Sequence, residues 1–207
     1  MTTTKEDRIF MKVDGFRFAA LKLCLVFGVV FVFQSFAGFE PAFNASSSPW
    51  WKFFTSIFGH GDLQHLLNNL FFIGLFGSIY ERLTSAKMFY LTFLASALVA
   101  NISAFLFFPG TSIIGASGGA MGLMAALAVY RPRKIGLALG VPAPMWFVLL
   151  VYVFINVAGL SAANNVAYEA HLLGLVAGAW IGVFLRDEAY GKFEGYEEEE
   201  RVEEEKD

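Results

Sequence analysis

The chain has 207 residues, of which 57% are hydrophobic, 17% aromatic and only 16% charged, and its mean hydropathy is +0.57. Soluble domains are about one quarter charged, so this composition favours a membrane protein over a soluble globular domain. The single cysteine, Cys24, excludes an internal disulfide, and we expect no nucleic-acid partner.

The formal charge of −3 comes from the C-terminal tail. The last 14 residues contain nine acidic and two basic side chains. The other 193 residues therefore carry 13 basic and nine acidic groups, a net charge of +4. Such an acidic run is usually solvated and disordered.

Six apolar stretches approach the roughly 20 residues that a helix needs to cross the hydrocarbon core of a bilayer. The fifth is placed after Pro142 and Pro144, because proline does not easily continue a helix. The six predicted spans lie near Ala19–Ala37, Asp62–Tyr80, Met88–Phe108, Ser112–Tyr130, Met145–Leu160 and Tyr168–Leu185.

The basic residues predict the orientation of these spans. Fourteen of the fifteen Lys and Arg residues fall on one side, and only Lys52 falls on the other. Cytoplasmic loops carry the excess of Lys and Arg, so both termini are expected in the cytoplasm. We predict a cytoplasmic N-terminal segment at 1–17, a six-helix membrane domain at 18–186 and an acidic, disordered cytoplasmic tail at 187–207.

Four polar side chains lie in the outer halves of spans 2, 4 and 6. His65 and Asn69 are four residues apart and share one face of span 2. Ser117 lies about five residues into span 4, and His171 three or four residues into span 6. At 1.5 Å per residue these positions are roughly 8 Å and 5 Å below the outer end. The four groups should therefore meet in one outer layer.

Small residues spaced four apart predict that spans 4 and 6 pack closely, because such rows let helix backbones approach in lipid. Packing alone could explain them, but close packing would also bring Ser117 within hydrogen-bond reach of His171. The rows are Gly115 with Gly119 and Gly118 with Gly122 on span 4, and Gly174, Gly178 and Gly182 on span 6.

These groups can support nucleophilic catalysis. A serine needs a base that takes its proton, and the imidazole of His171 has a suitable pKa range. His65, the Asn69 amide and the backbone N–H of Ser117 are candidate donors to an oxyanion. No orienting acid is evident, because Glu169 lies two residues from His171 and points to another helix face. We therefore favour a Ser–His dyad.

Simpler explanations exist for each residue. A lone serine in an apolar helix usually packs or bonds to the backbone, and an intramembrane histidine can relay protons or bind a metal. His60 and His65 could bind zinc, but the chain has only three histidines and no His-Glu-x-x-His motif. We expect no metal and no cofactor. A small transporter is disfavoured, because no polar path continues inward through Leu70–Tyr80.

Taken together, the motifs resemble those of the rhomboid family of intramembrane serine proteases. The resemblance runs from about Trp50 to Arg186. It rests on Gly115-Ala116-Ser117-Gly118, Ala170-His171-x-x-Gly174 and His60-x4-His65-x3-Asn69, with Trp51-Lys52 and Glu81-Arg82-Leu83 as further matches.

The resemblance implies an all-α, six-transmembrane-helix rhomboid-like bundle acting as a serine endopeptidase. Ser117 would be the nucleophile and His171 its base, while His65, Asn69 and the Ser117 amide would form the oxyanion hole. The substrates would be transmembrane helices of other proteins, cut near the outer membrane face. The lack of an evident targeting element favours an integral multi-pass protein of a prokaryotic plasma membrane.

Further residues would support the site. His60 would be structural or assist nearby, and Gly118 and Gly174 would allow the helices to meet. Met121 stands where the family often has an aromatic ring stacked on the catalytic histidine. The alternative function is that of a catalytically silent rhomboid-like protein that binds or escorts membrane proteins. Loss of Ser117 or His171 would indicate that alternative, and both are present.

Overall fold

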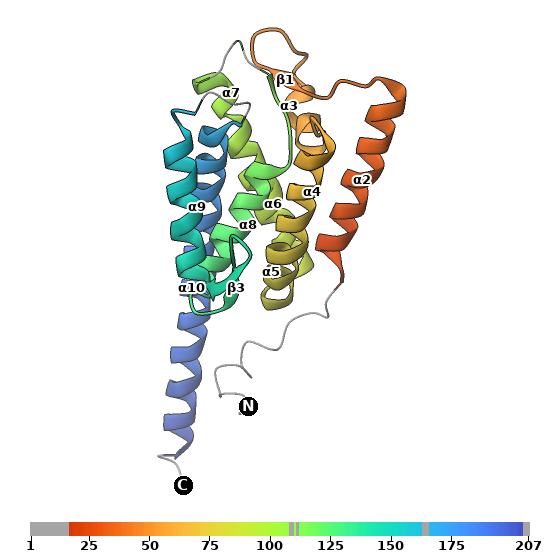
Figure 1. Cartoon of the computed structure of the whole chain (residues 1–207). Helices are drawn as coiled ribbons and strands as arrows, with labels where there is room; N and C mark the ends of the chain where they lie inside the picture. The colour runs from red at the N-terminus through yellow and green to blue at the C-terminus, as the bar shows by residue number, and fades with distance from the viewer. Residues whose placement is uncertain (1–16, 108–109, 111, 163–165, 205–207) are drawn as a thin grey trace.

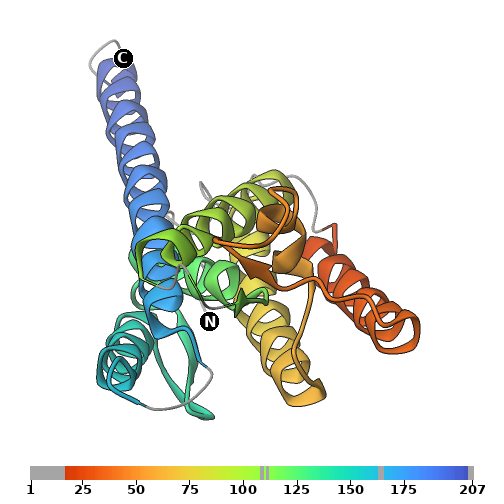
Figure 2. The ribbon, with the colours of Figure 1, turned by 90° about the horizontal axis from the view of Figure 1, so that it is seen from above.

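A computed structural model describes residues 17–107, 110, 112–162 and 166–204, with side chains described up to Asp187 except that of Ala104. Most of this part of the chain is helical. The helices stand side by side around α8 (Ser117–Tyr130), which occupies the middle of the bundle (Figures 1 and 2). Every side chain or glycine of α8 from Gly118 to Ala128 is buried, so this helix lies at the core of the bundle.

The other helices pack on α8 directly or through one another. The long helical units are α2 (Ala19–Ala37), α4 (Leu63–Phe72) continued by a π-helical turn η2 (Ile73–Gly77) and α5 (Ser78–Leu83), α6 (Ala86–Asn101) followed by α7 (Ser103–Leu106), α9 (Met145–Gly159) and α10 (Tyr168–Glu204). The short elements are α3 (Lys52–Thr55), η1 (Ser56–Phe58) and the strands β1 (Phe43–Asn44), β2 (Ser112–Ile113), β3 (Ile135–Ala138) and β4 (Val141–Pro144).

Two stretches of the described chain are long and apolar enough to cross a bilayer, namely α2 and the part of α10 from Tyr168 to Asp187. Three further apolar helices, α6, α8 and α9, are shorter. α2 has the predicted bounds, and α9 begins directly after Pro144, as the two prolines indicated. The fold is mostly helical rather than strictly all-α, because β1 pairs with β2 and β3 with β4, each pair antiparallel.

The predicted start of span 4 at Ser112 is wrong. Ser112 and Ile113 form β2, which pairs with β1 of the loop after α2. Gly115 has a φ of 120°, a conformation that favours glycine, and its N–H donates to the carbonyl of Ser56 at 2.9 Å. The chain turns there, so α8 begins at Ser117 itself rather than five residues earlier.

We expected the tail after Arg186 to be disordered, whereas the α10 backbone continues as a helix to Glu204. Glu, Lys and Arg are good helix formers, and extending an existing helix avoids the cost of starting a new one. Residues 1–16 of the expected N-terminal segment and 205–207 of the tail lie outside the described residues. The domain boundaries therefore stay predictions.

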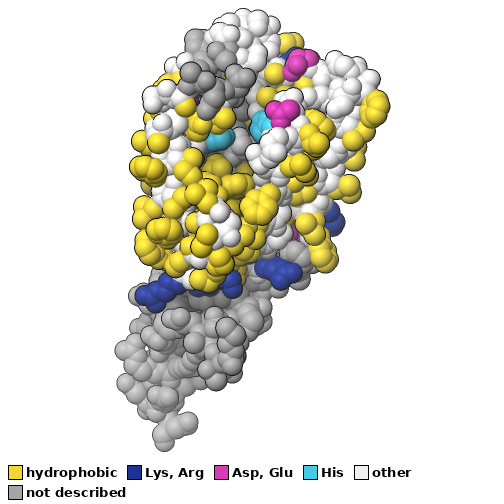
Figure 3. All heavy atoms as spheres, viewed as in Figure 1, with side chains coloured by type: hydrophobic (Ala, Val, Ile, Leu, Met, Phe, Trp, Pro, Cys, Tyr) yellow, Lys and Arg dark blue, Asp and Glu magenta, His cyan; other side chains and the backbone are white. Residues whose placement is uncertain are grey.

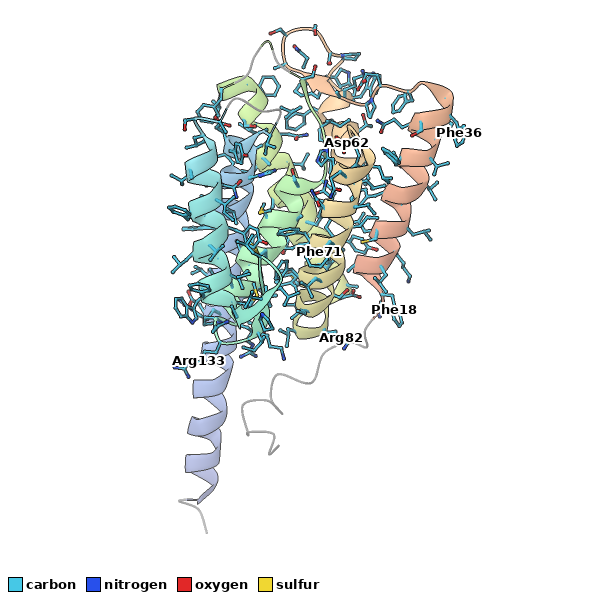
Figure 4. The ribbon with its side chains drawn as sticks, in the orientation of Figure 1. Phe18, Phe36, Asp62, Phe71, Arg82 and Arg133 are labelled. Atoms are coloured by element: carbon cyan, nitrogen blue, oxygen red, sulfur yellow. The ribbon has the colours of Figure 1, made fainter. Side chains whose placement is uncertain are left out.

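The two ends of the bundle differ in charge. Figure 4 places Phe18, Arg82 and Arg133 at one end, and Phe36 and Asp62 at the other. In Figure 3, Lys and Arg side chains gather at the first end, below a broad hydrophobic surface. α2 therefore starts at the basic end, and α4 runs back toward it.

Glycines of one predicted row, Gly118 and Gly122, bring α8 into backbone contact with α10. The other predicted row does not, because Gly115 precedes the helix and Gly119 faces Phe93 of α6. A Cβ atom on Gly174 would collide with the carbonyl group of Gly118, and one on Gly178 would collide with the carbonyl group of Gly122. One turn further along, a Cβ on Gly182 would lie 2.7 Å from the carbonyl oxygen of Ala126. This close packing is the structural reason why the first turns of α8 and α10 lie together.

The Gly178→Ala variant should therefore unfold more easily. Its added methyl group must push α10 away from Gly122, and such overpacking costs about 1–3 kcal/mol. The matched control is Gly28→Ala in α2, where a Cβ would meet no atom within 4 Å and alanine improves helix propensity. Thermal unfolding in detergent should show a lower Tm for Gly178→Ala only. Equal Tm values for both variants would contradict the packing argument.

Candidate active site

Ser117 and His171 lie in contact where α8 and α10 begin. Ser117 is the first residue of α8, and His171 lies in the first turn of α10. The Oγ of Ser117 is 2.8 Å from Nε2 of His171. This is a hydrogen-bond distance for a hydroxyl and an imidazole, and it is the geometry that a nucleophile and its base require.

Asn156 of α9 contacts the other ring nitrogen of His171. Its Oδ1 lies 2.8 Å from Nδ1 of His171, and its Nδ2 donates to the carbonyl of Tyr152 at 2.7 Å. The Asn156 side chain is buried, with 2% exposure. No orienting acid for His171 was evident from the sequence, and this amide was not considered there.

His65 and Asn69 of α4 face the segment that leads into Ser117. A Cβ atom on Gly115 would lie 2.6 Å from Nε2 of His65 and 3.8 Å from Nδ2 of Asn69. Only a glycine therefore allows this approach. Asp62 caps the N-terminus of α4, because its carboxylate accepts a hydrogen bond from the backbone N–H of His65 at 2.7 Å.

The Asn69 amide is buried and has a free donor. Its exposure is 4%, and Nδ2 has no hydrogen-bond partner among the described residues. An unpaired buried donor costs free energy in the resting protein. At the N-terminus of α8, the first backbone N–H groups also lack acceptors within the helix. The Asn69 amide lies beside Gly115, two residues before Ser117, and the N-terminus of a helix favours nearby negative charge.

His60 lies behind His65 rather than beside Ser117. Its ring packs edge to face against His65 at 5.2 Å and against Phe27 of α2 at 5.5 Å between centroids. Its backbone exchanges two hydrogen bonds with the Gln34 side chain of α2, at 2.6 and 3.2 Å. Burial and the neighbouring His65 lower the pKa of His60 to about 4, so its ring is neutral at pH 7.

The other residues that we predicted to support the site lie in the helix contacts next to it. A Cβ on Gly118 would collide with the methyl group of Ala100, and Gly174 faces the Gly118 carbonyl. Met121 is buried in the core, with 8% exposure. The aromatic ring against His171 comes instead from Tyr168 of the same helix, edge to face at 6.2 Å.

The polar groups of the site stand next to the buried, mostly apolar residues of α8. Figure 3 shows histidine side chains reaching the surface near the end opposite the basic one. Among the residues that the structure describes, no three His, Cys, Asp or Glu side chains gather as metal ligands would.

Comparison with known proteins identifies the family to which this chain belongs. The family model for the Rhomboid domain matches residues 47–188, which is more than half of the chain. The chain therefore belongs to the rhomboid family, whose members are embedded in membranes and which includes named proteases.

Three relatives illustrate the range of the family. The chain is 30% identical over 149 residues to the rhomboid protease GluP of Bacillus subtilis (strain 168), which aligns 69% of this chain with 28% of the relative. It is 35% identical over 77 residues to the chloroplastic rhomboid-like protein 11 of Arabidopsis thaliana, covering 37% of this chain and 28% of that one. It is 28% identical over 145 residues to rhomboid-related protein 2 of Mus musculus, covering 64% and 47%. The chain thus spans less than half the length of these relatives.

Proposed function

We propose that this protein is an intramembrane serine endopeptidase that cuts transmembrane helices of other membrane proteins near the outer membrane face. The observation that carries the proposal is the 2.8 Å contact between Ser117 Oγ and His171 Nε2. Membership of a family that contains a named protease supports it further.

Each step of the reaction has a candidate group. Nε2 of His171 takes the hydroxyl proton as Oγ of Ser117 bonds to the substrate carbonyl carbon. His65, Asn69 and the Ser117 amide donate hydrogen bonds to the resulting oxyanion. His171 then returns the proton to the leaving amine as the C–N bond breaks. A water molecule hydrolyses the acyl-enzyme, with His171 again acting as base.

The membrane arrangement that we propose is an integral multi-pass protein with six spans, both termini cytoplasmic, in a prokaryotic plasma membrane. The basic end of the bundle supports the orientation, since Lys and Arg collect on the cytoplasmic side. The proposed active site then lies toward the outer surface, where water can reach it. Helical peptide bonds are shielded by their own hydrogen bonds, so we expect preferred substrates to carry small or helix-weakening residues near the cut.

Reconstituted protein tests this function directly. Liposomes that contain the protein and a model transmembrane substrate should yield two fragments, and mass spectrometry should place the cut near the outer end of the substrate helix. A fluorophosphonate should label Ser117 in the wild type and leave Ser117→Ala unlabelled. Intact substrates across a panel, together with an unlabelled wild type, would favour the silent binding or escort protein instead.

A further inference from the structure

Asn156 joins the proposed catalytic base to a third helix. It is a buried amide in the apolar helix α9, and it bonds at both ends. Its oxygen lies 2.8 Å from Nδ1 of His171 on α10, and its nitrogen donates to the Tyr152 carbonyl one turn earlier on α9, at 2.7 Å. Neither contact is required to start or end α9, because Asn156 lies within the helix.

The Tyr152 carbonyl determines which way the amide points. A backbone carbonyl can only accept a hydrogen bond, so the NH₂ group of Asn156 must face Tyr152 and its oxygen must face His171. An amide oxygen also only accepts, so Nδ1 of His171 must carry the ring proton. In a neutral imidazole Nε2 is then the acceptor, and the Ser117 hydroxyl must donate to it.

We propose that Asn156 is a positioning residue that holds His171 in the tautomer that can deprotonate Ser117. The inference rests on the proposed protease function. The Tyr152 carbonyl, Asn156, His171 and Ser117 form one directional chain of hydrogen bonds across α9, α10 and α8. In the other tautomer a ring N–H would face the Ser117 oxygen, and no lone pair would be available for the hydroxyl proton.

A neutral orienting group suits an apolar site. A carboxylate at this position would be a charge in low-dielectric surroundings, which is expensive to keep ionised. An amide oxygen supplies the acceptor that Nδ1–H needs without that cost. When His171 becomes positively charged during the reaction, Nδ1–H still bonds to Asn156, so the chain does not need to rearrange.

The test compares Asn156→Leu, Asn156→Asp and the lipid-facing control Phe154→Leu, whose side chain is 72% exposed. Leucine keeps the volume but removes the acceptor, so kcat should fall about 10- to 100-fold, with KM changed less than about twofold. This loss is smaller than the ~10⁴-fold that follows when a triad histidine is held in the wrong tautomer, because leucine imposes no tautomer on His171. Phe154→Leu should match the wild type.

Asn156→Asp should restore most of the activity. In its protonated form the new carboxyl group can donate to the Tyr152 carbonyl and accept from Nδ1 of His171, which reproduces both bonds. A purely structural role for the amide would lower the Tm of Asn156→Leu together with its activity, whereas a positioning role lowers kcat and leaves the Tm and KM nearly unchanged. Tm values of both variants, measured in detergent, show whether the fold is kept.

Two results would overturn this inference. One is an Asn156→Leu variant with kcat within twofold of the wild type. The other is an Asn156→Asp variant as inactive as Asn156→Leu. Neither result touches the protease proposal, which fails if the wild type leaves every substrate intact or if Ser117→Ala still cleaves the substrate. An inactive Ser117→Ala with a fully active Asn156→Leu would therefore reject the positioning role alone.

Discussion

Ser117→Ala and His171→Ala are each expected to lower the rate of substrate cleavage about 10⁶-fold, which places both variants at the background of the assay. Without the imidazole, the Ser117 hydroxyl keeps its proton and is a weak nucleophile. Without the hydroxyl, His171 has no nucleophile to activate. Because the two groups act as one unit, the double variant should be no slower than either single one. Single-turnover cleavage in liposomes measures all three.

The control for this prediction is Val176→Leu on the same helix as His171, where the side chain is 67% exposed. It should cleave at the wild-type rate. Binding of the substrate should survive in both inactive variants, because neither group is needed to hold a helix against the bundle. A His171→Ala variant within tenfold of the wild-type rate would remove His171 from the proposed mechanism.

The helices were largely predictable, whereas the start of α8 was not. An apolar run of spanning length predicts a helix, and α2 has the predicted bounds. The residues from Ser112 to Ala116 are similar in polarity to the helix that follows, so hydropathy does not separate them. A glycine at position 115 is compatible with a row of small packing residues and with a positive φ, and only the first was predicted. The φ of 120° at Gly115 shows that this residue forms the turn before α8 rather than part of the helix.

The contact of Ser117 with His171 was expected from depth and glycine spacing, and the structure brings the two side chains together. The partner of His171 was missed because only acids were considered. An isolated Asn156 in an apolar helix was the available signal, since polar groups in such surroundings are usually retained for a purpose. Its partner depends on how α9 is rotated, and hydrophobic periodicity does not fix the rotation of a helix that is apolar nearly all round.

Asn69→Leu is expected to lower kcat about 10²- to 10³-fold, the usual effect of removing one oxyanion donor. In the resting structure Nδ2 of Asn69 is buried and has no partner among the described residues. On the proposed mechanism it gains one only when negative charge develops beside Ser117. The interaction therefore stabilises the transition state more than the bound substrate, so kcat and kcat/KM should fall together while KM stays nearly constant.

Stability should change in the opposite direction. Replacing a buried amide whose Nδ2 is unpaired by an apolar side chain of similar volume removes the cost of that buried donor, so the Tm of Asn69→Leu should equal or exceed that of the wild type. The matched control is Asn68→Leu, one position along α4, where the exposed amide only accepts from Gln64 at 2.9 Å. It should keep kcat within about twofold. A Tm that falls in step with the activity of Asn69→Leu would mean that this amide serves the fold and not the oxyanion.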